Sequence, residues 1–344
     1  MSPTILLVDV ASSERENWKA FLQEQNYKVF TARDADTALR QCHLLQPDLV
    51  LLHDTLPEMD GFELCRRLKE NPLNQLIPVV VIKRSSDPAE NSRGRNAGAA
   101  DFWGASTSLV EGLLRIESLL RLKSYMDEQA KCVVLSLAHS IEAKSPLIQG
   151  HSDRMAEYAV QFGESLGLEE RELQDLRVAG LLHDIGKVAV PDSILLKPGP
   201  LSANEMEVVK QHPVFGEQIC APLKSLRRIL PAIRHHHERM DGSGYPDGLR
   251  GQQIPLHARI LQVADIYDAL TTARPYRIAL TSEEALEILR QEALHGWIDF
   301  CLVREFLRIN QSEQEFQLRG RSMLASYYGV WRTAGNETGA MRIV

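Results

Sequence analysis

The sequence has few cysteines, and none is placed to form a thiolate metal site. They are odd in number, widely scattered and without a Cys-x-x-Cys pair: Cys42, Cys65, Cys132, Cys220 and Cys301. This spacing argues against a disulfide framework and against a zinc site built from thiolates. It is typical of ordinary buried thiols in a reducing compartment, so we expect a cytoplasmic protein.

Long apolar runs and an excess of basic charge are also missing. No stretch approaches the roughly 20 apolar residues of a membrane span, and the apolar start at Ile5 runs into Asp9 rather than into a signal-peptide cleavage site. The formal net charge of -7 leaves no broad basic face of the kind that follows a nucleic-acid backbone. We therefore expect neither a membrane nor a nucleic-acid partner.

What the sequence does contain predicts two folded units. A chain of 344 residues with 44% hydrophobic residues exceeds one average domain. In the first part, apolar runs of four or five residues alternate with amphipathic segments, at residues 5–8, 28–32, 48–52, 78–82 and 100–103. Such alternation is typical of βα units around a parallel sheet, so residues 1–105 should form a doubly wound α/β domain.

A linker helix is expected over residues 106–130, where the strand signals stop. Leu109, Leu113, Ile116 and Leu120 recur there at the three-four spacing of an apolar helical seam. Two hypotheses fit this seam. It packs on its own domain, or it forms a parallel coiled coil that joins two chains in a homodimer.

The remaining pattern is helical, with Gly/Pro-rich loops at residues 197–200 and 241–251. It predicts an all-α bundle over residues 131–310 and a C-terminal helical tail over residues 311–344.

The first domain resembles the receiver domain of two-component response regulators. The segments that carry the resemblance are ILLVDV, DLVLLHDTLPEMDGFELCRRLK, IPVVVI and AGAADFW. Such domains accept a phosphoryl group on an aspartate at the end of the third strand, four residues before the proline of the loop. That position holds His53, so no phosphoacceptor is expected.

Other parts of the family's phosphorylation site are replaced as well. Of the paired acids that hold magnesium only Asp9 remains, while Lys83 and Ala105 stand where the family has a hydroxyl residue and a lysine. Asp54 is an alternative acceptor, but a shift of one residue along a strand turns a side chain to the opposite face. We expect a module for dimerisation or for docking signalling proteins.

The second domain contains histidines and aspartates in a pattern that predicts a metal site. His183 and Asp184 follow the apolar run 179–182, at the buried end of a helix, where unpaired polar groups cost several kcal/mol and metal coordination removes that cost. Lys187 projects from the same side without being a ligand. The candidate ligands are His151, His183, Asp184, His212, His236, His237 and Asp265. Imidazole with carboxylate suits iron, manganese, zinc, cobalt or nickel.

Residues 130–310 resemble the HD-GYP subgroup of HD-domain phosphohydrolases. The resemblance rests on HSDRM, LLHDIGK, HPVFGEQI, HHERMDGSGYPDGL and IPLHARILQVADIYDALTTARPYR. It implies hydrolysis of cyclic di-GMP at a site with two metal ions, most often iron or manganese. One ion would be held by His151, His183, Asp184 and Asp265, and Asp184 would bridge to a second held by His212, His236 and His237. A third ion is not expected, because Leu147 replaces the glutamate on which it depends.

The resemblance also leads to an expected mechanism. A metal-bridging hydroxide would attack phosphorus, with catalytic roles for Asp184 and for Lys187 as the acid that protonates the leaving oxygen. The product would be pGpG, with further cleavage to GMP left open. Two alternatives remain: an adaptor that binds cyclic di-GMP with little turnover, and an HD phosphohydrolase of another nucleotide.

Six residues are expected to bind the substrate: Lys197, Tyr245, Asp268, Arg274, Tyr276 and Arg277. Three of them have alternatives. The Gly-Tyr-Pro turn with Tyr245 either contacts substrate or supports the preceding helix, Asp268 either orients a ligand or caps its helix, and Lys197 is either a binding residue or an exposed lysine.

Overall fold

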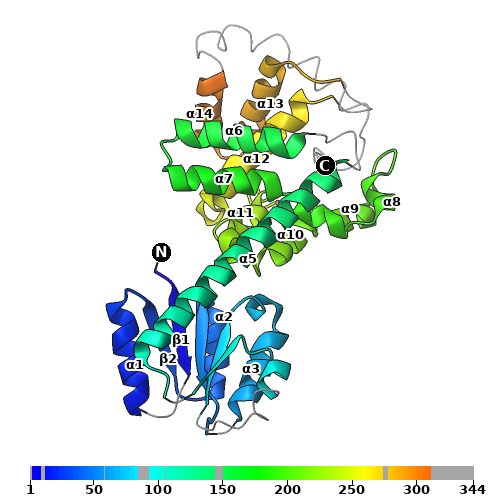
Figure 1. Ribbon diagram of the computed structural model, residues 1–344. Coiled ribbons are helices and arrows are strands. Elements are labelled where there is room, and N and C mark those ends of the chain that lie inside the picture. Colours follow the sequence, from blue (N-terminus) through cyan, green and yellow to red (C-terminus); the bar gives the residue numbers. More distant parts are fainter. Residues whose placement is uncertain are drawn as a thin grey trace. The chain divides into compact units, whose positions relative to one another are not determined.

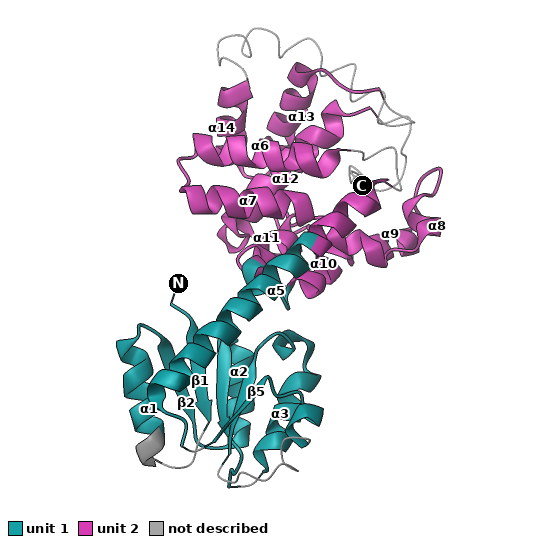
Figure 2. Ribbon diagram, viewed as in Figure 1, with its two compact units in different colours: residues 1–132, 221–225 teal, residues 133–220, 226–344 magenta. Residues whose placement is uncertain are grey.

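The computed structural model describes residues 2–8, 12–57, 59–83, 93–104, 106–143, 150–273 and 278–310. Two units are distinguished, residues 1–132 with 221–225 and residues 133–220 with 226–344 (Figure 2). No helix in these ranges is both long enough and apolar enough to cross a membrane. The helical tail predicted over residues 311–344 lies outside the described residues.

A five-stranded parallel sheet forms the centre of the first unit, with the strand order β2-β1-β3-β4-β5. The strands are β1 (Thr4–Val8), β2 (Lys28–Ala32), β3 (Leu49–His53), β4 (Val79–Lys83) and β5 (Asp101–Gly104). All five begin within one residue of the predicted runs. The prediction succeeds because strands of a parallel sheet covered on both faces are nearly continuous apolar runs.

Helices cover both faces of this sheet (Figure 1). They are α1 (Ser12–Glu24), α2 (Ala35–Leu45), α3 (Gly61–Glu70) with the 3-10 turn η1 (Pro72–Asn74), and α5 (Leu109–Ala143). Leu6, Val50 and Leu52 are buried in the core on the side of α2 and α3, whereas Leu7 and Leu51 are buried on the side of α1 and α5. The doubly wound α/β prediction is confirmed.

The loop after β3 depends on a glycine. A Cβ at Gly61 would overlap the carbonyl oxygen of His53, so only glycine lets the start of α3 close onto the end of the strand. The N–H of Gly61 donates to the carbonyl oxygen of Asp54 at 2.8 Å, and Asp60 caps α3 by accepting the N–H of Phe62 at 2.9 Å. The Asp-Gly pair of the receiver-like loop therefore has a local structural cause.

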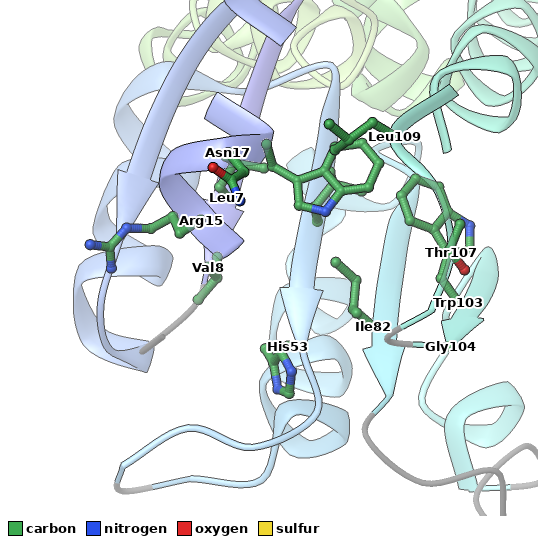
Figure 3. Close-up of a pocket in the computed structure, with 12 residues that line it drawn as sticks. Leu7, Val8, Arg15, Asn17, His53, Ile82, Trp103, Gly104, Thr107 and Leu109 are labelled. Atoms are coloured by element: carbon green, nitrogen blue, oxygen red, sulfur yellow. The ribbon is translucent and has the colours of Figure 1, made fainter. Parts of the chain in front are cut away.

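His53 occupies the carboxyl end of β3, beside a cavity of about 180 Å³ (Figure 3). Its side chain is buried, and its Nδ1 accepts the N–H of Thr55 at 3.3 Å and lies 2.9 Å from Oδ1 of Asp54. Lys83, at the end of β4, is also buried, with Nζ 5.9 Å from the ring centroid of Phe102. An imidazole thus stands at the expected acceptor position. Asp9 and Ala105 lie outside the described residues.

The predicted seam of α5 packs on its own domain. Ile116 is fully buried, and Leu113 and Leu120 pack beside it against the sheet residues of the same core. These side chains already have a partner within the chain, which supports the first of the two hypotheses for this seam. The helix itself continues to Ala143, 13 residues past the predicted end at residue 130.

The second unit is largely helical in its described part, as predicted. Its α-helices are the end of α5, α6 (His151–Ser165), α7 (Glu170–Leu182), α8 (Asp192–Leu195), α9 (Ala203–Val209), α10 (His212–Cys220), α11 (Leu230–His235), α12 (Leu256–Thr271), α13 (Ser282–Leu294) and α14 (Phe300–Asn310). Its 3-10 helices are η2 (Ile185–Ala189) and η4 (Gly251–Gln253), while η3 (Lys224–Leu226) begins in the segment 221–225 of the first unit. Gly180 of α7 packs on α6, because a Cβ there would lie 2.9 Å from the backbone N of Ala156.

Candidate metal centre

His183 and Asp184 lie at the junction between α7 and η2. The α-helix ends at Leu182, His183 is its C-cap, and Asp184 precedes the first residue of η2. A Cβ at Gly186 would overlap the carbonyl oxygen of His212 and crowd the N of Gly216, so glycine lets η2 pack directly on the backbone of α10. This contact brings His212 beside Asp184.

The seven predicted ligands come together in two groups. Asp184, His212, His236 and His237 form one, and His151, His183 and Asp265 form the other. Within each group the candidate ligand atoms all lie within 4.8 Å of one another. His235, which was not predicted as a ligand, points elsewhere, with Nδ1 2.9 Å from the carbonyl oxygen of Pro231 and Nε2 2.9 Å from Oδ2 of Asp247.

The carboxylate of Asp184 stands between the two groups. Its Oδ1 is 3.2 Å from Nε2 of His212. Its Oδ2 is 3.5 Å from Nε2 of His183 and 4.0 Å from Nε2 of His151. Each oxygen therefore faces a different group, which is the arrangement that a bridging carboxylate requires.

The histidine rings are held so that Nε2 faces the cluster. Nδ1 lies 2.7 or 2.8 Å from a backbone carbonyl oxygen three residues earlier in three rings: His183 to Gly180, His212 to Val209 and His236 to Ile233. The Nε2 atoms of His212 and His236 are 3.3 Å apart, as are those of His151 and His183. Because the Nδ1 proton of His212 and of His236 is committed to a carbonyl, their Nε2 lone pairs face each other. A cation between them removes that repulsion, so the donor set fits a metal ion.

Burial favours the neutral form of several rings. It is the largest influence on His183, His236 and His237, and it holds the pKa of each below its ordinary value. Burial alone would raise the pKa of Asp184, but Lys187 and the neighbouring imidazoles hold that pKa well below its usual range. Neutral imidazoles around an ionised carboxylate are the donors that a divalent transition metal prefers.

His151 is held differently from the other rings. Its Nδ1 lies 2.7 Å from Oδ2 of Asp268, whose Oδ1 accepts a bond from Nε of Arg154 at 2.5 Å. Burial lowers the pKa of His151, but Asp268, Asp265 and Asp184 outweigh burial and raise it. Arg154 also donates to Oγ1 of Thr272 at 3.2 Å.

Asp268 was grouped with the substrate-binding residues, and it was expected either to orient a ligand or to cap its helix. It is 2% exposed and bonded to His151 and Arg154, so the geometry supports the orienting role. The sequence reasoning missed Arg154. One signal was present, because Arg154 stands three residues after His151 and therefore on the same side of α6.

Lys187 lies beside Asp184, as expected, although on a 3-10 helix instead of the α-helix. Its Nζ is 2.6 Å from Oδ2 of Asp184. The ammonium group therefore contacts the carboxylate that stands between the two groups, without belonging to either.

The Gly-Tyr-Pro turn supports the histidines before it. The fully buried carboxylate of Glu238 accepts the backbone N–H groups of Asp247, Gly248 and Leu249 at 2.7, 3.1 and 3.0 Å. A Cβ at Gly244 would overlap the backbone N of Arg239. The ring of Tyr245 lies 4.9 Å from that of His237, tilted by 31°. The supporting role is thus visible, and Tyr245 remains partly exposed.

Lys197, another predicted substrate residue, pairs with Glu205. Lys197 lies in the turn before α9, and its Nζ is 2.7 and 2.9 Å from the carboxylate oxygens of Glu205 within that helix. Arg274, Tyr276 and Arg277 lie outside the described residues. Upstream of the cluster, Glu142 accepts the N–H of Ser152 at 2.5 Å, which is a structural role.

Comparison with known proteins agrees with this architecture. Residues 5–103 match the response regulator receiver domain, and residues 136–302 match the HD domain. The cyclic di-GMP phosphodiesterase response regulator RpfG of Xanthomonas campestris is 34% identical, over 97% of this chain and 92% of the relative. This chain belongs to the HD-GYP family of response regulators.

Other relatives of this HD-GYP response regulator differ in their named substrates. A probable cyclic di-GMP phosphodiesterase of Vibrio cholerae is 31% identical, over 84% of this chain and 74% of the relative. A 3′3′-cGAMP-specific phosphodiesterase of the same organism is 43% identical, over 54% of this chain and 41% of the relative. The second unit is accordingly an HD-domain hydrolase.

Proposed function

We propose that this HD-GYP response regulator hydrolyses cyclic di-GMP to the linear dinucleotide pGpG in a metal-dependent reaction. The observation that carries the proposal is the position of Asp184, with one oxygen facing each group of histidines. The relative with the same two domains over nearly its whole length is named a cyclic di-GMP phosphodiesterase, which supports the choice of substrate.

Two divalent ions, iron or manganese, fit the two groups. His151, His183 and Asp265 would hold one ion, and His212, His236 and His237 the other, with one oxygen of Asp184 given to each. When bound, such a pair would supply an activated water as nucleophile and would neutralise charge on the nonbridging phosphoryl oxygens. A third ion is not proposed, because Leu147 replaces the glutamate on which it depends in the family.

The residues of the chain have separate tasks in this reaction. Lys187 holds a proton on Nζ beside Asp184 and is proposed to donate it to the ribose 3′-oxygen that leaves. Asp268 orients His151, and the turn from Glu238 to Tyr245 orients His237. Tyr245 is partly exposed beside that ring, so it is also proposed to contact the substrate, together with Arg274, Tyr276, Arg277 and Lys197.

The direct test is hydrolysis by the metal-loaded protein. Protein loaded with manganese or iron should convert cyclic di-GMP to pGpG. Chromatographic separation of the nucleotides measures the conversion. His183→Ala and Asp184→Ala should abolish turnover, whereas His295→Ala, at an exposed histidine of the same unit, should not. Binding of cyclic di-GMP without hydrolysis at full metal loading would show an adaptor instead of an enzyme.

A second candidate substrate is 3′3′-cGAMP. The observation that favours it is the 43% identity of the second unit's region to a phosphodiesterase specific for that nucleotide. Comparison of kcat/KM for the two cyclic dinucleotides in one competition assay decides between them.

The first domain is proposed to dock signalling proteins without accepting a phosphoryl group. The support is the buried His53 at the acceptor position, engaged with Thr55 and Asp54.

We propose domain limits at residues 105, 130 and 310, with the linker helix between the first two.

A further inference from the structure

The cavity beside His53 continues one of the two cores of the first domain. Leu7, Leu51 and Trp103 line the cavity and also belong to the core on the side of α1 and α5. This core leaves a space of about 180 Å³ near the carboxyl ends of the strands. Protein interiors leave few voids larger than a water molecule. The space is therefore a candidate site for a small ligand.

His53 provides a hydrogen-bond donor to this cavity. It lies between Val8 and Ile82, which line the cavity with it (Figure 3). Its Nδ1 accepts the N–H of Thr55 at 3.3 Å and lies 2.9 Å from Oδ1 of Asp54, whereas its Nε2 bonds to none of the described residues. Nε2 carries a proton both in the neutral ring whose Nδ1 accepts and in the charged ring. A ligand with an acceptor oxygen can therefore bind there.

Two indole rings form an aromatic part of the lining. The rings of Trp18 and Trp103 have centroids 5.6 Å apart and are tilted by 33°. Nε1 of Trp103 donates to Oδ2 of Asp101 at 2.8 Å, which fixes that ring. The ring of Trp18 lies so close to Gly112 of α5 that a Cβ there would overlap it. Both surfaces are thus held in place, ready to contact another aromatic ring.

The charged side chains around the cavity favour an anion. Arg15 lines the cavity and is 6% exposed, and its Nε lies 3.7 Å from Oε1 of Glu16, on the outside of the domain. Of the described residues that line the cavity, none is an aspartate or a glutamate. Asp54 contacts the Nδ1 of His53 but is not part of the lining. Figure 3 shows the Arg15 side chain extending away from His53, so Arg15 contributes its positive charge and His53 the direct contact.

The volume limits the size of the ligand. An apolar cavity of roughly 150 Å³ is enough to hold benzene. A space of about 180 Å³ therefore admits a single six-membered ring with a small substituent, and it is too small for a nucleotide.

We propose that this cavity binds a small aromatic carboxylate. The ring of the ligand packs against Trp18 and Trp103, and a carboxylate oxygen accepts the proton on Nε2 of His53. This binding is independent of the enzymatic activity of the second unit.

Isothermal titration calorimetry of the purified protein with benzoate is the test. The wild type should bind one benzoate per chain with a Kd of roughly 1 mM or lower, an affinity within reach of a ligand of about nine heavy atoms. Acetate lacks the ring, and benzylamine carries the opposite charge. Each of these two compounds should bind at least about 10-fold more weakly than benzoate, because each lacks one of the two features that the cavity recognises.

Two variants place the ligand in the cavity. His53→Leu removes the donor and should weaken benzoate binding roughly 10-fold, whereas His43→Leu, at an exposed histidine of the same domain, should not. Ile82→Phe fills the cavity, so it should weaken binding by about the same factor while it raises the melting temperature. Thermal unfolding of all three variants separates loss of binding from loss of the fold.

Nuclear magnetic resonance of the indole N–H groups provides an independent location. The signals of Trp18 and Trp103 should shift when benzoate is added, and that of Trp297 in the second unit should not. The proposal is overturned if the wild type shows no saturable binding of benzoate at millimolar concentrations or binds benzylamine as tightly. Unchanged benzoate affinity in either His53→Leu or Ile82→Phe would also overturn it.

Discussion

Oδ2 of Asp268 lies 2.7 Å from Nδ1 of His151, on the opposite side of the imidazole from the nitrogen that faces the cluster. Arg154 in turn holds the same carboxylate. A carboxylate behind a ligating histidine fixes which ring nitrogen carries the proton and how the ring is oriented.

Removal of this carboxylate should weaken metal binding. We expect Asp268→Ala to reduce affinity for manganese roughly 10- to 100-fold, and Asp268→Asn to reduce it less because the amide oxygen can still accept the Nδ1 proton. Metal titration of the two purified variants is the measurement. If Asp268 only contacted substrate, KM would rise while metal affinity stayed at the wild-type value.

Chelation should destabilise the second unit. The Nε2 atoms of His212 and His236 lie 3.3 Å apart, so without an ion their lone pairs face each other. An ion that binds only the folded chain raises the free energy of unfolding by about 2.7 kcal/mol when the ion concentration is 100 times the Kd. The melting temperature measured by thermal unfolding should fall when a chelator is added and should recover after manganese is added. Asp184→Ala should show little recovery, and identical melting of wild type with and without metal would contradict the metal site.

Lys187→Met should lower kcat roughly 10²- to 10⁴-fold if Nζ protonates the leaving oxygen. The loss should shrink for bis(p-nitrophenyl) phosphate, because its leaving group does not need a proton. Metal content serves as the control, since Lys187 contacts Asp184 at 2.6 Å and its loss could disturb the ligand instead. Equal losses with both substrates would assign Lys187 to positioning Asp184.

Gly244→Ala should destabilise the protein by about 1–3 kcal/mol, because the added methyl would overlap the backbone N of Arg239. Gly104→Ala is a suitable control, since its methyl would meet nothing closer than Oγ of Ser106 at 3.7 Å. Calorimetric melting of both variants decides the matter. A neutral Gly244→Ala would mean that the turn does not brace the segment of His236 and His237, which follows α11.

Treatment with a small-molecule phosphodonor should leave the first domain unmodified. The acceptor position is a buried imidazole, and its Nδ1 accepts the N–H of Thr55 and lies beside Asp54. Intact-mass measurement, with an ordinary receiver domain as positive control, reports the result. An acid-labile phosphoryl adduct within residues 1–105 would restore phosphorylation as an input.

Much of this architecture follows from the sequence because the signals are local. Buried parallel strands are short apolar runs, and the cluster could be predicted because every ligand lies in a compact motif. The relationship between Arg154 and Asp268 joins residues 114 positions apart, so no spacing along the chain reveals it. The faces of α5 were ambiguous for another reason. Apolar residues occur on both sides of that helix, and periodicity alone does not say which side meets the sheet.

The contact between Gly186 and the backbone of His212 has a consequence for the whole centre. One side of the cluster begins at His183 and the other at His212, and the two segments meet main chain against main chain with no side chain between them. The gap between the two groups is therefore set by peptide geometry, which ordinary side-chain substitutions do not alter. Substitution of residues around the centre can change which ligand is bound there, while the backbone contact keeps the distance between the two groups constant.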